Sequence, residues 1–396
     1  MYNQHGHIDL DTVQDRTGTY SIKWDGITLD YKNPNLTPMS IADMDFKVPQ
    51  EVIDAVVRQA QVGIYGYAMP AECYTDVITT WLKERNDWDL HEDQVGFVVR
   101  VVDAISMAIR SMTDEGDAVI VHTPLYTFFE SAVVGARRKL VRNRLQYTES
   151  GYSIDFTEFE QQIEDEHVRM FVLCNPHNPT GRVWTVEELE RIVDICQRHD
   201  VIIVSDDIHS DLIMPGYHYT PIAKIAKAHG YDKVVTMKSA SKTFNLAGLQ
   251  LGYYISENPD IMRAIQEEKD YTTYPDLPNN FVIAAISAAY RYGVPWLDRV
   301  CSYINDNYLM LKKLIDDKFP DACLAELQGT YLTWLDVSYL PIDEKTLMAR
   351  LDESGIGAET TSSFGINDGL YIRMNIACPH ATMMQGLDAL EKALTL

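Results

Sequence analysis

The lysine between Ser239 and Gly248 is the residue of this sequence best suited to covalent chemistry. Lys242 stands among small and hydroxyl-bearing residues, just after the apolar run from Val234 to Met237. A strand that ends there would present the lysine in a loop, where chemistry is usually located. In an enclosed site a lysine can lose its proton and form a Schiff base with a carbonyl group. The alternative is an ordinary solvated lysine in a polar turn, which this segment alone favours.

Two further residues decide between these interpretations. Ser239 stands three residues before Lys242, and its hydroxyl could bind a phosphate group. A lysine beside a phosphate binder suggests pyridoxal 5′-phosphate (PLP), which also needs an acidic group facing its pyridine nitrogen. Asp206 follows the apolar run from Val201 to Val204 and could supply that acid.

The elements around these residues predict that they lie close together. Apolar strands alternate with amphipathic helices from about residue 95 to 255, with strands at 118–121, 170–174, 201–204 and 234–237. Strands of this kind are buried on both faces, which predicts a mostly parallel sheet in an α/β fold. Ligands bind at the carboxyl ends of the strands in such a sheet. Tyr126, Asn175, Asp206 and Lys242 all fall shortly after these strands. Their convergence favours a site over a solvated lysine.

The two ends of the chain have a different pattern. Residues 1–48 are rich in loop-forming residues, whereas a long amphipathic helix is predicted over 296–319. Alternating residues at 329–336 and 370–375 are typical of half-buried strands. We therefore predict three parts: an N-terminal segment at 1–48, a large domain at 49–284, and a small α+β domain at 285–396 that the N-terminal segment joins.

Composition excludes several classes of function. The chain has 396 residues and a formal net charge of −24, which argues against binding to nucleic acids or anionic membranes. The six cysteines are dispersed without a C-x-x-C pair, so we expect a reducing, cytoplasmic environment. The sequence contains neither a signal-peptide pattern nor an apolar run of membrane-spanning length. His5 and His7 have no further ligands at useful spacing, so no metal site is expected.

Four ordered motifs carry a resemblance to a known family. They are Asn175–Gly181, Ser205–Leu212, Ser239–Asn245 and Arg373–Asn375, and the segments Ile41–Phe46 and Cys378–His380 accompany them. Together they resemble fold-type I PLP-dependent enzymes of the class I/II aminotransferase superfamily, and within it the cystathionine β-lyase-like C–S lyases. The resemblance spans about residues 40 to 380. It implies a large domain with a mostly parallel seven-stranded sheet flanked by helices.

The resemblance also implies roles around the cofactor ring. Lys242 would hold PLP covalently and then move the proton at the substrate Cα. Asp206 would pair with the protonated pyridine nitrogen. Asn175 would hydrogen-bond the phenolic oxygen of the ring, and Tyr126 would stack on the ring. His209 occupies a cofactor-site position where many aminotransferases have tyrosine and the lyase-like branch has histidine.

Further roles concern the phosphate group. The backbone N–H groups of Val101 and Val102 would bind it together with the Ser239 hydroxyl. Tyr67 would reach the phosphate of a neighbouring subunit, which implies a homodimer with composite active sites.

Two positions depart from the family pattern at the phosphate. Gln250 stands where many aminotransferases carry a cationic phosphate ligand, and Arg100 replaces the glycine expected before the phosphate-binding turn. The charge of the phosphate would then be met by the helix dipole, backbone groups and hydroxyls.

The expected substrate is a small amino acid. Arg373 would bind its α-carboxylate bidentately, and Ala42 and Asp43 would contribute to substrate binding. The leading hypothesis is β-elimination from cystathionine or another S-substituted cysteine, which gives a thiol, pyruvate and ammonia. The alternatives are an aminotransferase and a non-catalytic protein of the same fold that serves in regulation or interaction.

Overall fold

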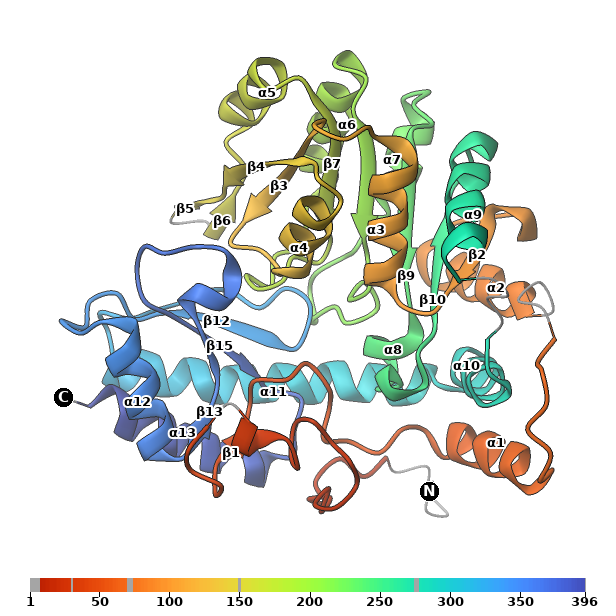
Figure 1. Ribbon diagram of the computed structural model, residues 1–396. Coiled ribbons are helices and arrows are strands. Elements are labelled where there is room, and N and C mark those ends of the chain that lie inside the picture. The colour runs from red at the N-terminus through yellow and green to blue at the C-terminus, as the bar shows by residue number, and fades with distance from the viewer. Residues whose placement is uncertain (1–7, 30, 70–73, 149–150, 274–277, 396) are drawn as a thin grey trace.

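The computed structural model describes residues 8–29, 31–69, 74–148, 151–273 and 278–395. A seven-stranded sheet with the order β2-β10-β9-β8-β7-β3-β4 forms its centre (Figure 1). The strands are β2 (Val95–Val98), β3 (Ala118–Thr123), β4 (Lys139–Arg144), β7 (Val168–Cys174), β8 (Ile202–Asp206), β9 (Val234–Lys238) and β10 (Gly252–Ile255). The direction of β10 is reversed, and the other six strands run parallel to one another. The predicted mostly parallel seven-stranded sheet is confirmed.

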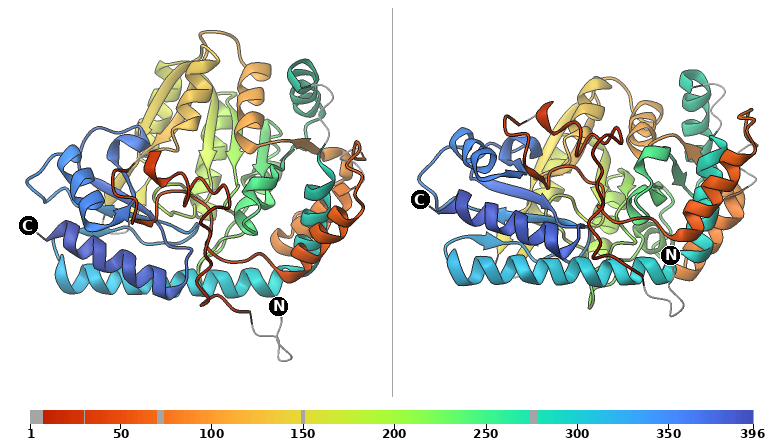
Figure 2. Two further views of the ribbon diagram at one scale, coloured as in Figure 1. Left: turned by 60° about the horizontal axis from the view of Figure 1, so that its bottom comes forward. Right: turned by 90° about the horizontal axis from the view of Figure 1, so that it is seen from below.

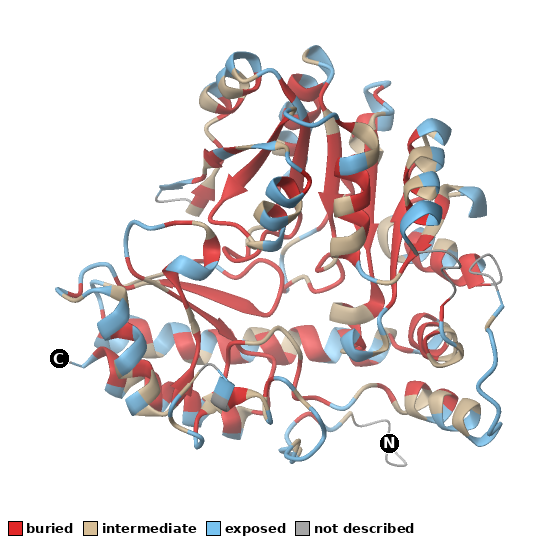
Figure 3. Ribbon diagram, viewed as in Figure 1, coloured by how far each residue is buried: buried red, intermediate tan, exposed pale blue. Residues whose placement is uncertain are grey.

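Helices cover both faces of this sheet. One face packs against α3 (Val101–Met112), α4 (Phe128–Gly135) and α9 (Pro259–Thr273). The other packs against α5 (Phe156–Asp165), α6 (Val186–Arg198) and α7 (Ile222–Ala228). The central strands β3, β7, β8 and β9 are largely buried between these layers, as Figure 3 shows in red, which explains why their sequences are mostly apolar.

A second, antiparallel sheet with the order β11-β12-β15-β14 lies beside the large one. Its strands are β11 (Cys323–Leu324), β12 (Leu332–Asp336), β14 (Glu359–Thr360) and β15 (Tyr371–Asn375). The helices α11 (Val294–Lys318), α12 (Glu344–Ser354) and α13 (His380–Leu394) belong to the same region. The predicted long helix at 296–319 is therefore confirmed, with its ends shifted by one or two residues.

The N-terminal segment runs along these C-terminal elements. Its strand β1 (Thr37–Pro38) pairs in parallel with β13 (Ile356–Gly357). In Figure 2 the red N-terminal segment lies beside the blue C-terminal elements. Residues that are distant in sequence thereby meet at the carboxyl edge of the large sheet.

The remaining elements are shorter or peripheral. They are α1 (Gln50–Gln61), α2 (Thr75–Asn86), α8 (Ala240–Thr243), α10 (Asn280–Tyr292), the hairpin β5 (Gln146–Thr148) and β6 (Gly151–Ser153), and the 3-10 turns Ile27–Leu29, Glu92–Gln94, Ala247–Leu249 and Thr361–Phe364. Among the described helices, none is both long and apolar enough to cross a membrane. Five cysteines have free thiols: Cys174, Cys196, Cys301, Cys323 and Cys378. Cys73, His5 and His7 lie outside the described residues.

Candidate active site

A cavity of about 740 Å³ opens at the carboxyl ends of the central strands. Its walls come from the ends of β2, β3, β8 and β9, from β15, and from the N-terminal segment. Ten residues predicted from the sequence line it: Ala42, Asp43, Val101, Val102, Tyr126, Asp206, His209, Ser239, Lys242 and Arg373. The fold thus brings together residues that are separated by more than 300 positions in the chain.

Lys242 lies in the single turn of α8 that follows β9. Its Nζ donates a hydrogen bond of 2.7 Å to the Ala42 carbonyl oxygen, which also accepts the Tyr331 hydroxyl at 2.8 Å. Burial lowers the pKa of Lys242 to about 8, although the carboxylates of Asp43 and Asp206 oppose this shift. Lys242 is thus partly buried and hydrogen-bonded within the protein, unlike a solvated lysine in a polar turn.

Asp206 is the last residue of β8 and is buried. Its Oδ1 accepts the backbone N–H of Ile208 at 3.2 Å. Burial raises the pKa of Asp206 to about 7, and the charge of Asp207 acts in the same direction, whereas Lys242 lowers it. A cation beside this carboxyl group would favour its ionised form, which suits it to pair with a protonated ring nitrogen.

Asn175 follows β7 and is completely buried, but it does not line the cavity, whereas its neighbour Cys174 does. The Asn175 amide nitrogen lies 3.4 Å from the Thr220 carbonyl oxygen, and its Oδ1 lies 3.4 Å from the Trp184 backbone nitrogen. Both separations are longer than a typical hydrogen bond. The amide is therefore weakly held beside the cavity wall.

Tyr126 and His209 line the cavity, and both side chains are uncharged. Burial raises the pKa of Tyr126 to about 12, so its hydroxyl keeps its proton. Burial lowers the pKa of His209 far below its usual value, and the charges of Lys242 and Arg373 act in the same direction. The Nδ1 atom of His209 is buried and has no hydrogen-bond partner within the described part of the chain.

The start of α3 lies at the edge of the cavity. Val101 and Val102 occupy its first turn, where backbone N–H groups have no partner within the helix. Gly252 on β10 allows the close approach of this turn, because a Cβ at position 252 would lie 3.0 Å from the Val101 nitrogen. Arg100 is more than half exposed, and its Nε donates to Asp103 at 2.9 Å.

The Ser239 hydroxyl is already bonded within the protein. It donates to the Leu251 carbonyl oxygen and accepts the Ser241 backbone N–H at 2.9 Å. Ser239 lines the cavity, but its hydroxyl also contacts the Ser241 hydroxyl at 2.8 Å, so both of its neighbours are within the protein. The neighbouring hydroxyl of Ser241, which sequence analysis did not select, also lines the cavity.

Arg373 extends from β15 and is only 4% exposed. Its two terminal nitrogens donate to the Asn178 Oδ1 at 3.2 Å and to the Ser40 carbonyl oxygen at 2.9 Å. It also forms an ion pair with Glu359, which stands directly opposite on β14. Asn178 and Glu359 were not predicted as site residues. Asn178 could have been found, because it lies within the turn motif at 175–181. Glu359 could not, because its position depends on strand pairing.

The N-terminal segment contributes five lining residues that were not predicted as site residues, namely Arg16, Tyr20, Ser21, Ile22 and Ile41. Tyr67, by contrast, does not line the cavity of its own chain and is 95% exposed.

The donor set of the cavity fits PLP. A lysine of lowered pKa, a buried carboxyl group, a histidine ring and a helix start packed against Gly252 line one cavity. A mostly parallel sheet with this set at its carboxyl edge defines a fold-type I PLP-dependent enzyme.

The chain belongs to the aminotransferase class I and II family, whose model matches residues 34–390. It is 34% identical over 390 residues to cystathionine beta-lyase PatB of Bacillus subtilis, covering 98% of this chain and 100% of the relative. Cystalysin from Treponema denticola, which contains a PLP cofactor, superposes with a TM-score of 0.92 at 32% identity, covering 98% and 99% of the two chains. The PLP-bound C–S lyase from Staphylococcus hominis superposes with a TM-score of 0.91 at 29% identity, covering 99% of each chain.

Proposed function

We propose that this protein is a PLP-dependent C–S β-lyase that cleaves cystathionine or another S-substituted cysteine to a thiol, pyruvate and ammonia. The observation that carries the proposal is the joint placement of Lys242, Asp206 and Arg373 on one cavity. A proton acceptor, an acid for the cofactor ring, and a carboxylate binder are the groups this reaction needs. The likeness to a cystathionine beta-lyase, to cystalysin and to a C–S lyase supports this reaction among those of the family.

Each of these residues has a defined task. When bound, PLP supplies an electron sink for the charge that develops at the substrate Cα. The Lys242 amine takes the Cα proton, and its lowered pKa favours the neutral form that can accept one. Arg373 binds the α-carboxylate with a buried guanidinium group, which fixes the Cα relative to Lys242. Ala42 and Asp43 form the adjoining wall for the substrate.

Other residues hold the cofactor in this proposal. Asp206 pairs with the ring nitrogen, and Asn175 turns its weakly held amide to the phenolic oxygen. Tyr126 supplies a stacking surface. The uncharged ring of His209 lines the same space.

The proposed phosphate site uses the backbone N–H groups of Val101 and Val102 at the start of α3. The Ser239 hydroxyl can take part only if it leaves the Leu251 carbonyl oxygen. Arg100 also lines the cavity, but its side chain is more than half exposed and is paired with Asp103.

The proposal includes a homodimer in a cytoplasmic location. The nearly complete exposure of Tyr67 supports a role in a second subunit, because its hydroxyl serves no contact in its own cavity. The division into 1–48, 49–284 and 285–396 also belongs to the proposal, with one refinement. The predicted boundary at residue 284 falls inside α10. We place it instead at Gly293, which lies between α10 and α11.

A pyruvate assay on a panel of cysteine conjugates tests the function. Purified protein is incubated with PLP and cystathionine, S-methylcysteine or S-ethylcysteine, with and without 2-oxoglutarate. We expect pyruvate and free thiol in equal amounts without the keto acid, and none from Lys242→Ala, which cannot accept the Cα proton. Absence of pyruvate across the panel would contradict the proposal.

An aminotransferase is the second candidate, because the family to which the chain belongs carries that name. In that reaction Lys242 would return the proton to the cofactor rather than promote loss of the thiol. Turnover that requires 2-oxoglutarate would favour this candidate. A non-catalytic protein would show neither activity, and its Lys242→Ala variant would behave like the wild type.

A further inference from the structure

The segment from Ser40 to Phe46, here called the 40–46 segment, is fixed by side chains from the elements of the active site. Its carbonyl oxygens accept hydrogen bonds from Arg373 at Ser40, from Asn375 at Ile41 and Asp43, from Lys242 and Tyr331 at Ala42, and from Asn245 at Met44 and Phe46. A shift of this segment would therefore change the hydrogen bond between the Lys242 amine and the Ala42 carbonyl oxygen. The N-terminal loop holds the same segment from the other side.

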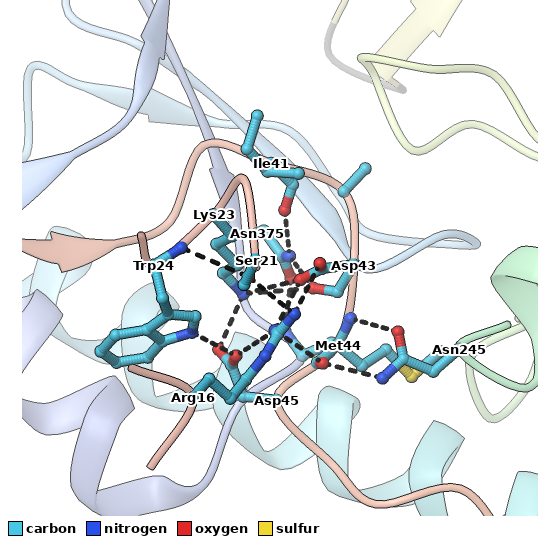
Figure 4. Close-up of polar contacts among 12 residues, drawn as sticks. Arg16, Ser21, Lys23, Trp24, Ile41, Asp43, Met44, Asp45, Asn245 and Asn375 are labelled. Carbon is cyan, nitrogen blue, oxygen red and sulfur yellow. Dashed lines mark hydrogen bonds and ion pairs between the residues drawn. The ribbon is translucent and has the colours of Figure 1, made fainter. Parts of the chain in front are cut away.

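Arg16 of that loop forms a bidentate ion pair with Asp43 (Figure 4). Its two terminal nitrogens lie 2.9 Å from the two carboxylate oxygens of Asp43, one on each. Among the described residues, the only other cation within ion-pair distance of this carboxylate is Lys23, at 3.7 Å. Such a two-point contact fixes the plane of the carboxylate as well as its charge.

Asp45 does not depend on Arg16 in the same way. Its oxygens contact the Lys23 Nζ at 2.7 Å and the Trp24 Nε1 at 2.9 Å in addition to Arg16 at 2.8 Å. Lys23 and Asp45 are both almost completely buried. Without Arg16, Asp45 would thus keep its contacts with Lys23 and Trp24. Asp43 would lose both of its hydrogen bonds from Arg16.

A released Asp43 would act on Lys242. Both residues line the cavity, and the Lys242 amine already bonds to the carbonyl oxygen of the residue before Asp43. The other charged groups that act on this amine are Asp206 and Arg373, and the titratable rings around it are His209, Tyr331 and Tyr126. An unpaired carboxylate at position 43 would favour the ammonium form of Lys242.

We propose that Arg16 is a positioning residue that keeps Asp43 from forming an ion pair with Lys242 and so leaves the lysine amine free to react. The importance of this amine rests on the proposed function, but the effect of Arg16 on it does not. Arg16 acts through Asp43 and need not touch substrate or cofactor.

Competitive acetylation of Lys242 in the full-length chain, freed of PLP, tests the proposal. The labelled fraction is measured by peptide mass spectrometry from neutral to alkaline pH. In Arg16→Gln the midpoint of labelling is expected to rise by about one pH unit, which makes the amine about tenfold less reactive at neutral pH. In the double variant Arg16→Gln with Asp43→Asn the midpoint should return to, or fall below, the wild-type value, because the acting carboxylate is gone.

Arg58→Gln on α1 is the matched control and should leave the midpoint unchanged. An unchanged midpoint in Arg16→Gln would overturn the proposal. Equal upward shifts in the single and double variants would also overturn it, since they would assign Arg16 a general role in holding the loop. If circular dichroism shows Arg16→Gln to be unfolded, Arg16→Lys replaces it: a smaller upward shift supports the two-point contact, and no shift refutes it. Because labelling requires neither substrate nor cofactor, a chain without lyase activity would still give a valid result.

Discussion

At the scale of single residues, burial moves two ionisable groups of the cavity toward their neutral forms. It lowers the pKa of Lys242 to about 8 and raises that of Asp206 to about 7. A buried amine and a buried carboxyl group both cost stability when charged. Burial of the Asp206 carboxyl group therefore lowers the stability of the cofactor-free protein when this group is ionised. A cation bound beside Asp206 would reduce this loss.

Replacing Asp206 by Asn should reveal this cost. The carboxyl pKa is 3.8 in the unfolded chain and about 7 in the folded one. Because the folded value is raised, the contribution of Asp206 to stability is complete below the unfolded pKa and is lost as pH rises toward 7. We expect cofactor-free Asp206→Asn to be more stable than the wild type at neutral pH, by at most on the order of 4 kcal/mol.

Urea unfolding of both cofactor-free proteins across this pH range measures the difference, which should vanish near the unfolded pKa. A difference that is constant with pH would contradict the prediction. The same variant should bind PLP more weakly, since an amide cannot pair with a ring cation. The Asp206 carboxyl group thus lowers the stability of the cofactor-free protein and raises its affinity for PLP.

At the scale of elements, the site depends on how closely β10 approaches the start of α3. Gly252 makes this approach possible, because an added Cβ would lie 3.0 Å from the Val101 nitrogen and 3.2 Å from the Arg100 carbonyl carbon. Both atoms are backbone and cannot rotate away. The sequence alone does not single out this glycine, since β10 is the one reversed strand of the sheet.

Gly252→Ala should therefore displace the first turn of α3 and weaken PLP binding by about tenfold or more, which corresponds to 1.4 kcal/mol or more. Fluorescence titration with PLP gives the affinity. Gly135→Ala is the control, since a Cβ at position 135 meets no atom within 4 Å. Equal affinities in the two variants would show that the turn tolerates the added methyl group.

At the scale of the whole molecule, the exposed segment around Tyr67 suits a contact between two copies of the chain. Ile64, Tyr65, Tyr67 and Met69 are each more than 60% exposed. Apolar side chains gathered in one surface segment are typical of an interface. A cavity that receives Tyr67 from a second copy would make each subunit depend on its partner.

Mixing two inactive variants tests this dependence. Tyr67→Ala and Lys242→Ala are unfolded together and refolded with PLP. In a composite dimer, random pairing makes about half of the dimers mixed, and each mixed dimer has one site in which both residues are intact. Activity should therefore rise to about a quarter of the wild-type value, provided that Tyr67→Ala alone is strongly impaired. Activity no greater than the mean of the two separate variants would argue against a shared site.

Much of the fold follows from local sequence. The strands β3, β7, β8 and β9 are continuous apolar runs, because they are buried on both faces and have no solvent-facing side. The edge strand β4 was not predicted, since Lys139, Arg142 and Arg144 interrupt its apolar positions. The reversal of β10 was not predicted either, because strand direction depends on pairing rather than on composition.

By itself the sequence determined the main chemistry of the site. Lys242, Asp206 and Arg373 stand in motifs whose order identifies them, and the carboxyl ends of parallel strands must share one edge. Only the tertiary structure decided what holds these groups in place. Glu359 meets Arg373 through strand register, and Arg16 meets Asp43 because a loop of irregular sequence folds over the cavity. Such contacts join residues by position in space, which no local pattern encodes.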